Sequence, residues 1–279
     1  MSHTGSLLAG KKGLVMGVAN DRSIAWGIAH QAALNGAELA FTYQGEALER
    51  RVRPLAESIK SSLILPCDVT DPASMDATFA ALAKAWGKLD FVVHAIAFSD
   101  KEQLKGRYIN TTRENFLRTM DISCFSFTDV SRRAAALMPD GGSLLTLSYL
   151  GADRVTPHYN VMGVAKAALE ASVRYLAADL GRDKIRVNAI SAGPIKTLAA
   201  SGIGDFRHIL KWNELNAPLH RNITIEDVGR SGVYLLSEMS SGVTGEVHHV
   251  DSGYHVVGMM DVQSAPEIAE LVKGVNPDK

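Results

Sequence analysis

Three side chains with hydrogen-bonding and acid–base chemistry lie close together in the middle of the sequence. Tyr149 follows an apolar run, and Tyr159 and Lys166 lie in the next segment, which has helical periodicity. Seven steps along a helix of 3.6 residues per turn return to within about 20° of the same face. The phenol and the ammonium group can therefore enter one pocket, where the lysine charge would favour an anionic or strongly hydrogen-bonded tyrosine oxygen. The structural alternative is that both tyrosines pack with their hydroxyls satisfied.

The first apolar run ends in a turn that could hold a pyrophosphate. Gly17 follows the run 13–16, and a helix is expected to begin at Ser23 and Ile24. A small residue lets the backbone turn sharply, and the free N–H groups of the helix start would then face the anion. Because the segment departs from the strict G-x-G-x-x-G pattern, an ordinary strand–turn–helix with incidental glycines is the alternative.

Residues at the ends of three later apolar runs extend this expected cofactor site. Gln44 ends the second run and is neutral, which favours NADH over NADPH as the cofactor, with NADPH as the alternative. Asp68 and Val69 end the third run, where a carboxylate could bond to the adenine amino group or could instead cap a helix. Ile96 follows the fourth run, close to His94, which is interpreted as a hydrogen-bonded core histidine.

Short apolar runs alternate with longer amphipathic segments along the whole chain. This alternation is typical of a parallel sheet covered by helices on both faces. Strands are expected at 13–16, 38–43, 63–67, 91–95, 143–148, 186–191 and 247–250. Helices are expected near 23–35, 45–60, 71–86, 112–138, 157–181 and 224–238. The sequence thus predicts an α/β fold, a Rossmann-like doubly wound parallel sheet of about seven strands in a single domain.

Start signals mark three of the expected helices. Pro72 after Asp71 stands at a first helical position, and Thr224 with Asp227 three residues later resembles a capping box. Pro157 is expected to open the helix that carries the catalytic candidates in the same way.

The chain has no repeat or low-complexity linker that would divide it. Residues 1–260 are expected to form one dinucleotide-binding domain. The less regular stretch at about 193–223 is expected to be a functional loop, because long loops of this kind are usually functional. Residues 261–279 are expected to be a C-terminal tail.

Composition excludes several classes of function. Of the 279 residues, 46% are apolar and 21% are charged, and the net charge is −1. This balance argues against a nucleic-acid-binding protein, which would carry an excess of basic residues. Two cysteines far apart are too few for a metal site, so no metal is expected. The sequence has neither a signal peptide nor an apolar run long enough to span a membrane, which predicts a cytoplasmic protein with no membrane partner.

The motifs together resemble a known family. The spacing Tyr149-x9-Tyr159-x6-Lys166, followed by Asn-Ala-Ile-Ser-Ala-Gly-Pro at 188–194, is similar to the enoyl-acyl-carrier-protein reductases of the short-chain dehydrogenase/reductase superfamily. The resemblance runs from about residue 8 to 260 and is most specific in the blocks 41–44, 146–152, 197–202, 245–247 and 249–251.

The resemblance implies reduction of the 2,3-trans double bond of enoyl-acyl-carrier-protein thioesters by hydride transfer from NADH, in fatty acid biosynthesis. Tyr159 would hydrogen-bond to the enolate oxygen, Lys166 would orient the cofactor, and Tyr149 would lie near the acyl chain. Contacts to the nicotinamide end of the cofactor are implied for Ile195, Lys196, Thr197, Leu198 and Ala199. Contacts to the substrate are implied for Ser99, Tyr149, Tyr159, Ala199, Ile203 and Phe206.

Two kinds of partner follow from the same resemblance. The acyl carrier protein that presents the thioester is acidic, and Arg207, His208 and Lys211 could form its docking surface, although a solvated helix face is the plainer interpretation. A homotetramer is implied because members of this superfamily commonly associate through their long helices.

Two alternative functions stay open at this point. A short-chain reductase could act on another activated alkene or on a carbonyl, but the carbonyl enzymes are expected to carry Tyr-x-x-x-Lys with a serine thirteen residues before that tyrosine. Here those two positions hold Met162 and Tyr149. A cofactor-binding scaffold that has lost catalysis is the other alternative, and the presence of both Tyr159 and Lys166 argues against it.

Overall fold

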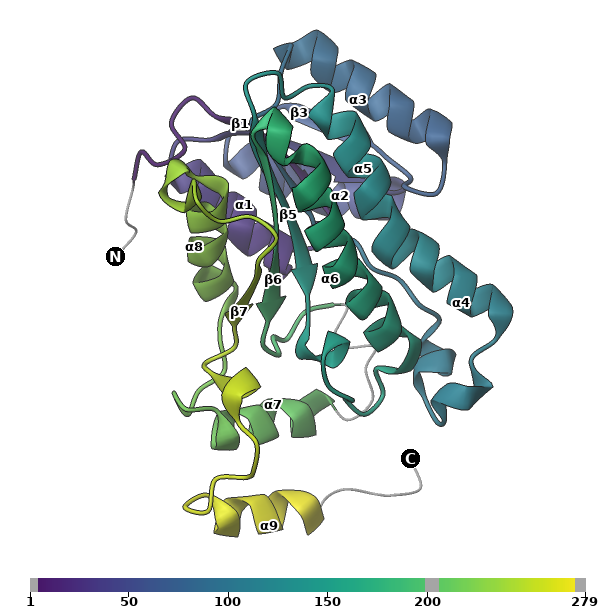
Figure 1. The fold of residues 1–279 in the computed structure, drawn as a ribbon, viewed down its shortest axis with the longest axis vertical. Coiled ribbons are helices and arrows are strands. Elements are labelled where there is room, and N and C mark those ends of the chain that lie inside the picture. The colour runs from purple at the N-terminus through teal and green to yellow at the C-terminus, as the bar shows by residue number, and fades with distance from the viewer. Residues whose placement is uncertain (1–4, 199–205, 274–279) are drawn as a thin grey trace.

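The structure, a computed structural model, describes residues 5–198 and 206–273. Its centre is one sheet of seven parallel strands in the order β3-β2-β1-β4-β5-β6-β7 (Figure 1). The strands are β1 (Lys12–Met16), β2 (Glu38–Tyr43), β3 (Leu63–Pro66), β4 (Phe91–His94), β5 (Gly142–Ser148), β6 (Ile185–Ala192) and β7 (Val247–Val250). The predicted Rossmann-like doubly wound sheet is confirmed, and each expected strand is present within one residue of its expected bounds.

Helices cover the sheet on both faces because the central strands carry apolar side chains on both sides. All four residues of β4 are buried, as expected for a strand inside a covered parallel sheet. One face is covered by α1 (Ile24–Leu34), α2 (Glu46–Ser58) and α8 (Ile225–Leu236). The other is covered by α3 (Pro72–Trp86), α5 (Ser126–Ala135) and α6 (Asn160–Leu180).

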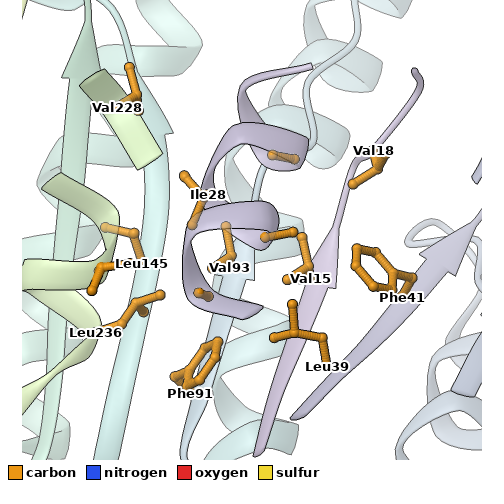
Figure 2. Packing of buried hydrophobic residues seen from close by; sticks show 14 of the residues in the cluster. Val15, Val18, Ile28, Leu39, Phe41, Phe91, Val93, Leu145, Val228 and Leu236 are labelled. Carbon is orange, nitrogen blue, oxygen red and sulfur yellow. The ribbon is translucent and has the colours of Figure 1, made fainter. Parts of the chain in front are cut away.

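The first face of the sheet holds a continuous apolar core. Figure 2 shows Ile28 of α1 next to Val93 of β4, and Leu236 of α8 next to Leu145 of β5, all in one cluster. Residues such as Ile28 and Val93 have no exposed surface. Burying one such side chain contributes roughly 1.5–3 kcal/mol, so this packing holds the two central strands rigidly beneath the site at their carboxyl ends.

Helix boundaries follow the predicted capping signals in two cases and depart from them in a third. The Thr224 hydroxyl accepts from the Asp227 N–H, and the Asp227 carboxylate accepts from the Thr224 N–H, so the capping box is confirmed. Asp71 caps α3 by accepting from the Ala73 N–H. The expectation for Pro157 was wrong: it lies in a turn, and α6 begins at Asn160.

The helix expected at 112–138 is interrupted. It consists of α4 (Arg113–Met120), a π-helical segment (Asp121–Phe125) and α5. The hydroxyl of Ser126 donates to the Ile122 carbonyl oxygen, and such competing side-chain bonds accompany departures from regular helix. The interruption lies against α6, the helix that carries Lys166.

Two helices occupy regions that the sequence predicted as loop or tail. Within the stretch at 193–223 the structure contains α7 (Phe206–Asn216), and the C-terminal region contains α9 (Ala265–Lys273). Both lie below the carboxyl edge of the sheet in Figure 1, with α9 beyond α7. Across residues 5–198 and 206–273, none of the helices is long and apolar enough to cross a membrane.

Candidate active site

The carboxyl ends of the strands place most of the predicted site residues along one edge of the molecule. Chain order reverses between β1 and β4, because the crossover from β3 returns to the other side of β1. Such a switch point leaves a crevice in which open parallel sheets bind ligands. The residues brought to this edge directly after strands are Gly17, Gln44, Asp68, Val69, Ile96, Tyr149 and Ile195.

Gly17 is required by the packing of the two strands at this switch point. Its φ is +95°, and a Cβ built on it would lie 2.0 Å from the Ala95 carbonyl oxygen. Any larger residue would therefore force the ends of β1 and β4 apart. The glycine turn predicted from the sequence is present, and the tertiary contact with Ala95 explains it independently of any ligand.

The start of α1 suits an anion. Ser23 is the N-cap residue, but its hydroxyl accepts from the N–H groups of Ala19 and Asn20, both at 3.0 Å, and makes no cap bond to the helix. The first turn of α1, which begins at Ile24, contains no acidic residue. Backbone N–H groups at a helix start that lack a side-chain cap are suited to a phosphate. The donor set expected for a pyrophosphate is thus present.

Gln44 and Asp68 form a polar pair at the ends of β2 and β3. The Gln44 amide nitrogen donates to a carboxylate oxygen of Asp68 at 2.8 Å. Burial acts to raise the pKa of Asp68, but hydrogen bonds from Thr70 and Gln44 outweigh it and lower the pKa below its usual value. The carboxylate therefore stays charged at neutral pH. A fixed negative charge beside Gln44 disfavours a second negative group, such as a 2′-phosphate, at this position.

Lys166 is buried on α6 with its charge directed at the sheet. The residue is 7% exposed, and its ammonium donates to the Leu147 carbonyl oxygen at 2.7 Å. Burial lowers the pKa of Lys166 to about 8. One backbone acceptor leaves ammonium N–H groups for further acceptors, since the group has three donors. Ribose hydroxyls are acceptors of the right kind.

Tyr149 and Tyr159 meet edge to face next to this lysine's helix. Their ring centroids are 5.1 Å apart with an interplanar angle of 68°. Burial raises the pKa of Tyr149 to about 12 and raises that of Tyr159 further, with additional contributions from Tyr149 and Glu170. Both phenols are therefore protonated near neutral pH and can donate a hydrogen bond.

The structure bears on one of the two predicted effects of the Lys166 charge on Tyr159. The ammonium was expected to favour an anionic or a strongly hydrogen-bonded tyrosine oxygen, and the raised pKa of Tyr159 argues against the anionic form. The physical reason is burial: Tyr159 is 8% exposed and packs with Leu104, Val161 and Met162, while the ammonium of Lys166 is directed to Leu147. Tyr159 can act as a hydrogen-bond donor, not as a phenolate.

Gly151 lets the loop after β5 press against Tyr159. It lies in the short 3-10 turn η4 (Leu150–Ala152), and a Cβ at this position would lie 2.4 Å from the Tyr159 ring. A Cβ at Gly163, on the first turn of α6, would in turn lie 2.7 Å from the Gly151 carbonyl oxygen. The two glycines thus allow the turn after β5 to approach both Tyr159 and α6, and neither was singled out from the sequence.

Sequence reasoning also missed Glu170 and Ser148. Glu170 lies one helical turn beyond Lys166, and its carboxylate accepts a short hydrogen bond from the Ser148 hydroxyl at the end of β5. Burial is the main cause that raises the pKa of Glu170. The i, i+4 spacing from Lys166 was a signal in the sequence, but the contact with Ser148 depends on how α6 lies across β5.

The remaining residues predicted for the site lie in the core, near α7 or, in two cases, outside the described residues. His94 is a core histidine, as interpreted: its ring nitrogens lie within hydrogen-bond distance of Thr146 and Ser126, and burial lowers its pKa to about 3. The buried Ser99 hydroxyl bonds to Asn115 and Thr119. Phe206 is the first residue of α7. The predicted contacts of Ala199 and Ile203 lie outside the described residues.

The remaining segment after β6 runs back toward the sheet. Ile195 packs on the same apolar core as β1 and β4, and its carbonyl oxygen accepts from the Thr197 N–H at 2.8 Å. Gly193 is held to the end of β7 through a bond from its N–H to the Val250 carbonyl oxygen. Residues 195–198, which include Lys196 and Leu198, therefore follow β6 at the same edge as Tyr149 and Lys166.

A cavity of about 410 Å³ adjoins Tyr149. Its lining is mainly apolar and comes from the loop after β5, from α7 and from the C-terminal region. The lining residues include Tyr149, Leu150, Val155, Pro157, Ile209, Trp212, Tyr254, Leu271 and Val272. A site for a small apolar group thus begins at one of the two tyrosines.

A doubly wound sheet with an uncapped helix start, a buried Tyr159 and a buried Lys166 is typical of a dinucleotide-binding reductase of the short-chain type. Comparison with known proteins is consistent with this class. Residues 17–255 match the family described as Enoyl-(Acyl carrier protein) reductase. The enoyl-[acyl-carrier-protein] reductase [NADH] 1 of Rhizobium meliloti is 67% identical over 271 residues, which cover 97% of this chain and 99% of the relative.

Solved structures of enoyl-acyl carrier protein reductases are also similar to this chain in sequence and fold. The enoyl-(acyl-carrier-protein) reductase of Anaplasma phagocytophilum, solved in complex with NAD, is 61% identical with a TM-score of 0.90, over 93% of this chain and 99% of that one. The Bacillus cereus enoyl-acyl carrier protein reductase, solved with NADP+ and indole naphthyridinone, is 55% identical with a TM-score of 0.90, over 91% of this chain and 100% of that one.

The chain therefore belongs to the enoyl-(acyl carrier protein) reductase family. The predicted resemblance, fold class and oxidoreductase class are confirmed.

Proposed function

We propose that this chain reduces the 2,3-trans double bond of enoyl-acyl-carrier-protein thioesters, with NADH as the hydride donor, in the elongation cycle of fatty acid biosynthesis. The observation that supports this most strongly is the convergence of a protonated, buried Tyr159 with Tyr149 beside the helix of Lys166. The family membership and the name of the Rhizobium meliloti relative support the same reaction.

The proposed chemistry assigns a task to each of the three side chains. NADH, when bound, supplies a hydride to the β-carbon of the thioester, and negative charge then develops on the thioester oxygen. Tyr159 donates a hydrogen bond to that oxygen, which stabilises charge that appears only as the reaction proceeds. Lys166 donates to the ribose hydroxyls of the cofactor, and Tyr149 lies against the acyl chain. A proton delivered to the α-carbon completes the reduction.

Preference for NADH rests on the end of β2. Gln44 offers no positive charge there, and its amide is held by the charged Asp68 at 2.8 Å. The guanidinium of Arg50 is paired with Glu46 on α2. A 2′-phosphate would thus meet a carboxylate without a dedicated cation. NADPH is expected to be the poorer substrate.

We also propose that the chain forms a homotetramer and works in the cytoplasm. Large apolar side chains are exposed along α4 to α6: Leu117 is 57%, Phe125 58% and Tyr175 77% exposed. Association through these helices would cover them, since exposed apolar patches mark protein–protein interfaces. Sedimentation equilibrium at micromolar concentration would detect the tetramer.

The function is tested by following NADH and NADPH oxidation with crotonyl and longer enoyl thioesters, and with a β-ketoacyl thioester. Enoyl substrates alone should be reduced, and faster with NADH. Tyr159→Phe should lower kcat about 100-fold, the usual cost of one oxyanion donor. Lys166→Ala should lower kcat and also weaken cofactor binding, because the ribose loses its donor.

The matched control is Tyr175→Phe on the same helix, which keeps the apolar ring that the proposed tetramer would cover, removes only a hydroxyl remote from the site and should leave kcat unchanged. Full activity in a well-folded Lys166→Ala variant would contradict the assignment. Reduction of the β-ketoacyl thioester would indicate the carbonyl alternative, and cofactor binding without any turnover would indicate a scaffold.

A further inference from the structure

The C-terminal helix α9 forms one side of the cavity that begins at Tyr149. Leu271 and Val272, in the last turn of α9, line the cavity together with Ile209 and Trp212 of α7. The cavity volume of about 410 Å³ falls within the range of sites that enclose small ligands. One wall of this space is thus supplied by residues that the sequence assigned to a tail.

The helix is attached to the body of the protein by specific contacts. Asn216, at the end of α7, accepts from the Asp261 N–H at 2.8 Å, and the Ser264 hydroxyl donates to the Leu215 carbonyl oxygen at 3.2 Å. Ile268, on the inner side of α9, is only 5% exposed. These contacts fix the start of α9 against α7, which places its last turn over the cavity.

The cavity has the chemistry of a hydrocarbon site. Most of its larger side chains are aliphatic or aromatic, and two of the polar groups in its walls, those of Trp212 and Arg154, are bonded to protein. The Trp212 indole nitrogen donates to the Tyr254 hydroxyl at 2.8 Å, and the Arg154 guanidinium donates to the Val257 carbonyl oxygen at 3.0 Å. A ligand that entered would therefore gain mainly from burial of apolar surface.

We propose that α9 is the far wall of the acyl-chain pocket, and that Leu271 and Val272 set the preference of the enzyme for longer enoyl chains. The proposal rests on the proposed function, because it takes the ligand to be the acyl chain whose thioester lies at Tyr159. A short chain ends near Tyr149, whereas a longer chain continues into the cavity and contacts α9. Chain-length preference would thus reside in a segment remote from the reacting atoms.

The experiment compares kcat/KM for trans-2-dodecenoyl and crotonyl thioesters in the full-length enzyme. Leu271→Trp fills the far end of the cavity, so the dodecenoyl-to-crotonyl ratio should fall about tenfold, the equivalent of roughly two methylene groups left unburied. Leu271→Ala opens the wall and should lower the same ratio by a smaller factor, because the chain end loses contacts. Ala269→Trp adds the same ring on the exposed side of α9 and should leave the ratio unchanged.

A binding measurement complements the kinetics. Trp212 lines the cavity, so a saturated dodecanoyl thioester should change its fluorescence, and the change should be absent in Trp212→Phe and weaker in Leu271→Trp. Thermal unfolding checks that each variant is folded. If the wild-type enzyme reduces enoyl thioesters but neither Leu271 variant alters the ratio or the fluorescence change, the role of α9 is refuted. If the wild-type enzyme reduces no enoyl thioester, the proposed function itself fails.

Discussion

At the scale of single residues, the site depends on burying groups that are ordinarily solvated. Lys166 is held by one hydrogen bond to Leu147 and faces His94, Cys124 and Glu170 across its pocket. The nearby His94 is neutral over the working pH range because burial lowers its pKa to about 3. The buried ammonium can donate further hydrogen bonds, and the hydroxyl oxygens of a ribose could accept them.

The lowered pKa of Lys166 predicts how stability depends on pH. Its folded value is about 8, below the ordinary 10.5, so between these values the unfolded chain binds more protons than the folded one. Stability therefore rises with pH across this window, and the penalty of roughly 3 kcal/mol is fully present below pH 8. Lys166→Met removes the titrating group.

The measurement is the free energy of unfolding by urea, for the wild type and Lys166→Met without cofactor, from pH 7 to 10. The wild type should gain stability relative to the variant by a few kcal/mol as the pH rises above 8, because its buried amine then loses the proton. The other groups around position 166 are the same in both proteins, so their titration cancels in the comparison. A difference that stays constant with pH would show that the amine is not destabilised by burial.

At the scale of elements, the turn η4 and the start of α6 act as one positioning unit for Tyr159. The residues on either side of this tyrosine have positive φ, +59° at His158 and +38° at Asn160. Such backbone is unfavourable for residues other than glycine and persists where surrounding contacts impose it. Here the Asn160 amide donates to the carbonyl oxygens of Leu104 and Gly106, at 3.2 and 3.3 Å.

Gly151→Ala should displace this unit. The new methyl would lie 2.4 Å from the Tyr159 ring, so the ring or the turn must move. We expect kcat for enoyl reduction to fall about 10-fold to 100-fold, because small displacements of a positioned group are costly. Stability should fall by about 1–3 kcal/mol from overpacking.

Gly181→Ala is the matched control. An added Cβ at Gly181 has no atom within 4 Å, and its backbone is helical, so both kcat and the melting temperature should stay close to those of the wild type. Unchanged kcat in Gly151→Ala would show that the turn tolerates the methyl and does not set the position of the tyrosine.

At the scale of the whole molecule, the active-site edge must also receive a carrier protein. Arg207 is exposed on α7, and Lys211, one turn later, pairs with Glu214 at 3.4 Å. These cations lie on the helix that also lines the cavity at Tyr149, through Ile209. An acidic carrier docked on α7 would therefore deliver its thioester next to the site.

Charge reversal on α7 tests this docking surface. Arg207→Glu with Lys211→Glu should raise KM for an enoyl thioester on the carrier protein by about tenfold, because two attractive contacts become repulsive. KM for the coenzyme A thioester should change little. Arg182→Glu, an exposed charge at the opposite edge of the sheet, is the control. Equal changes in KM for both substrates would contradict a docking role.

Much of this molecule could be predicted from its sequence alone. Apolar runs fixed the seven strands and the parallel sheet, because only residues buried on both faces form such runs. The seven-residue spacing predicted Tyr159 and Lys166 on one face of one helix, but only Lys166 lies in α6: Tyr159 precedes the helix, between two residues of positive φ. Thr224 and Asp227 likewise predicted the start of α8, because a capping box needs only residues that are neighbours in the chain.

What the sequence left undetermined depends on contacts between distant segments. The raised pKa of Tyr159, the bond from Ser148 to Glu170 and the approach of Gly151 to the ring all require β5 and α6 to be packed first. Residues expected to be a tail form α9 and line the cavity, and their contact with α7 holds them there. Local pattern determined which side chains are available for the chemistry, whereas burial, which tertiary packing alone decides, determined their charge state and their surroundings.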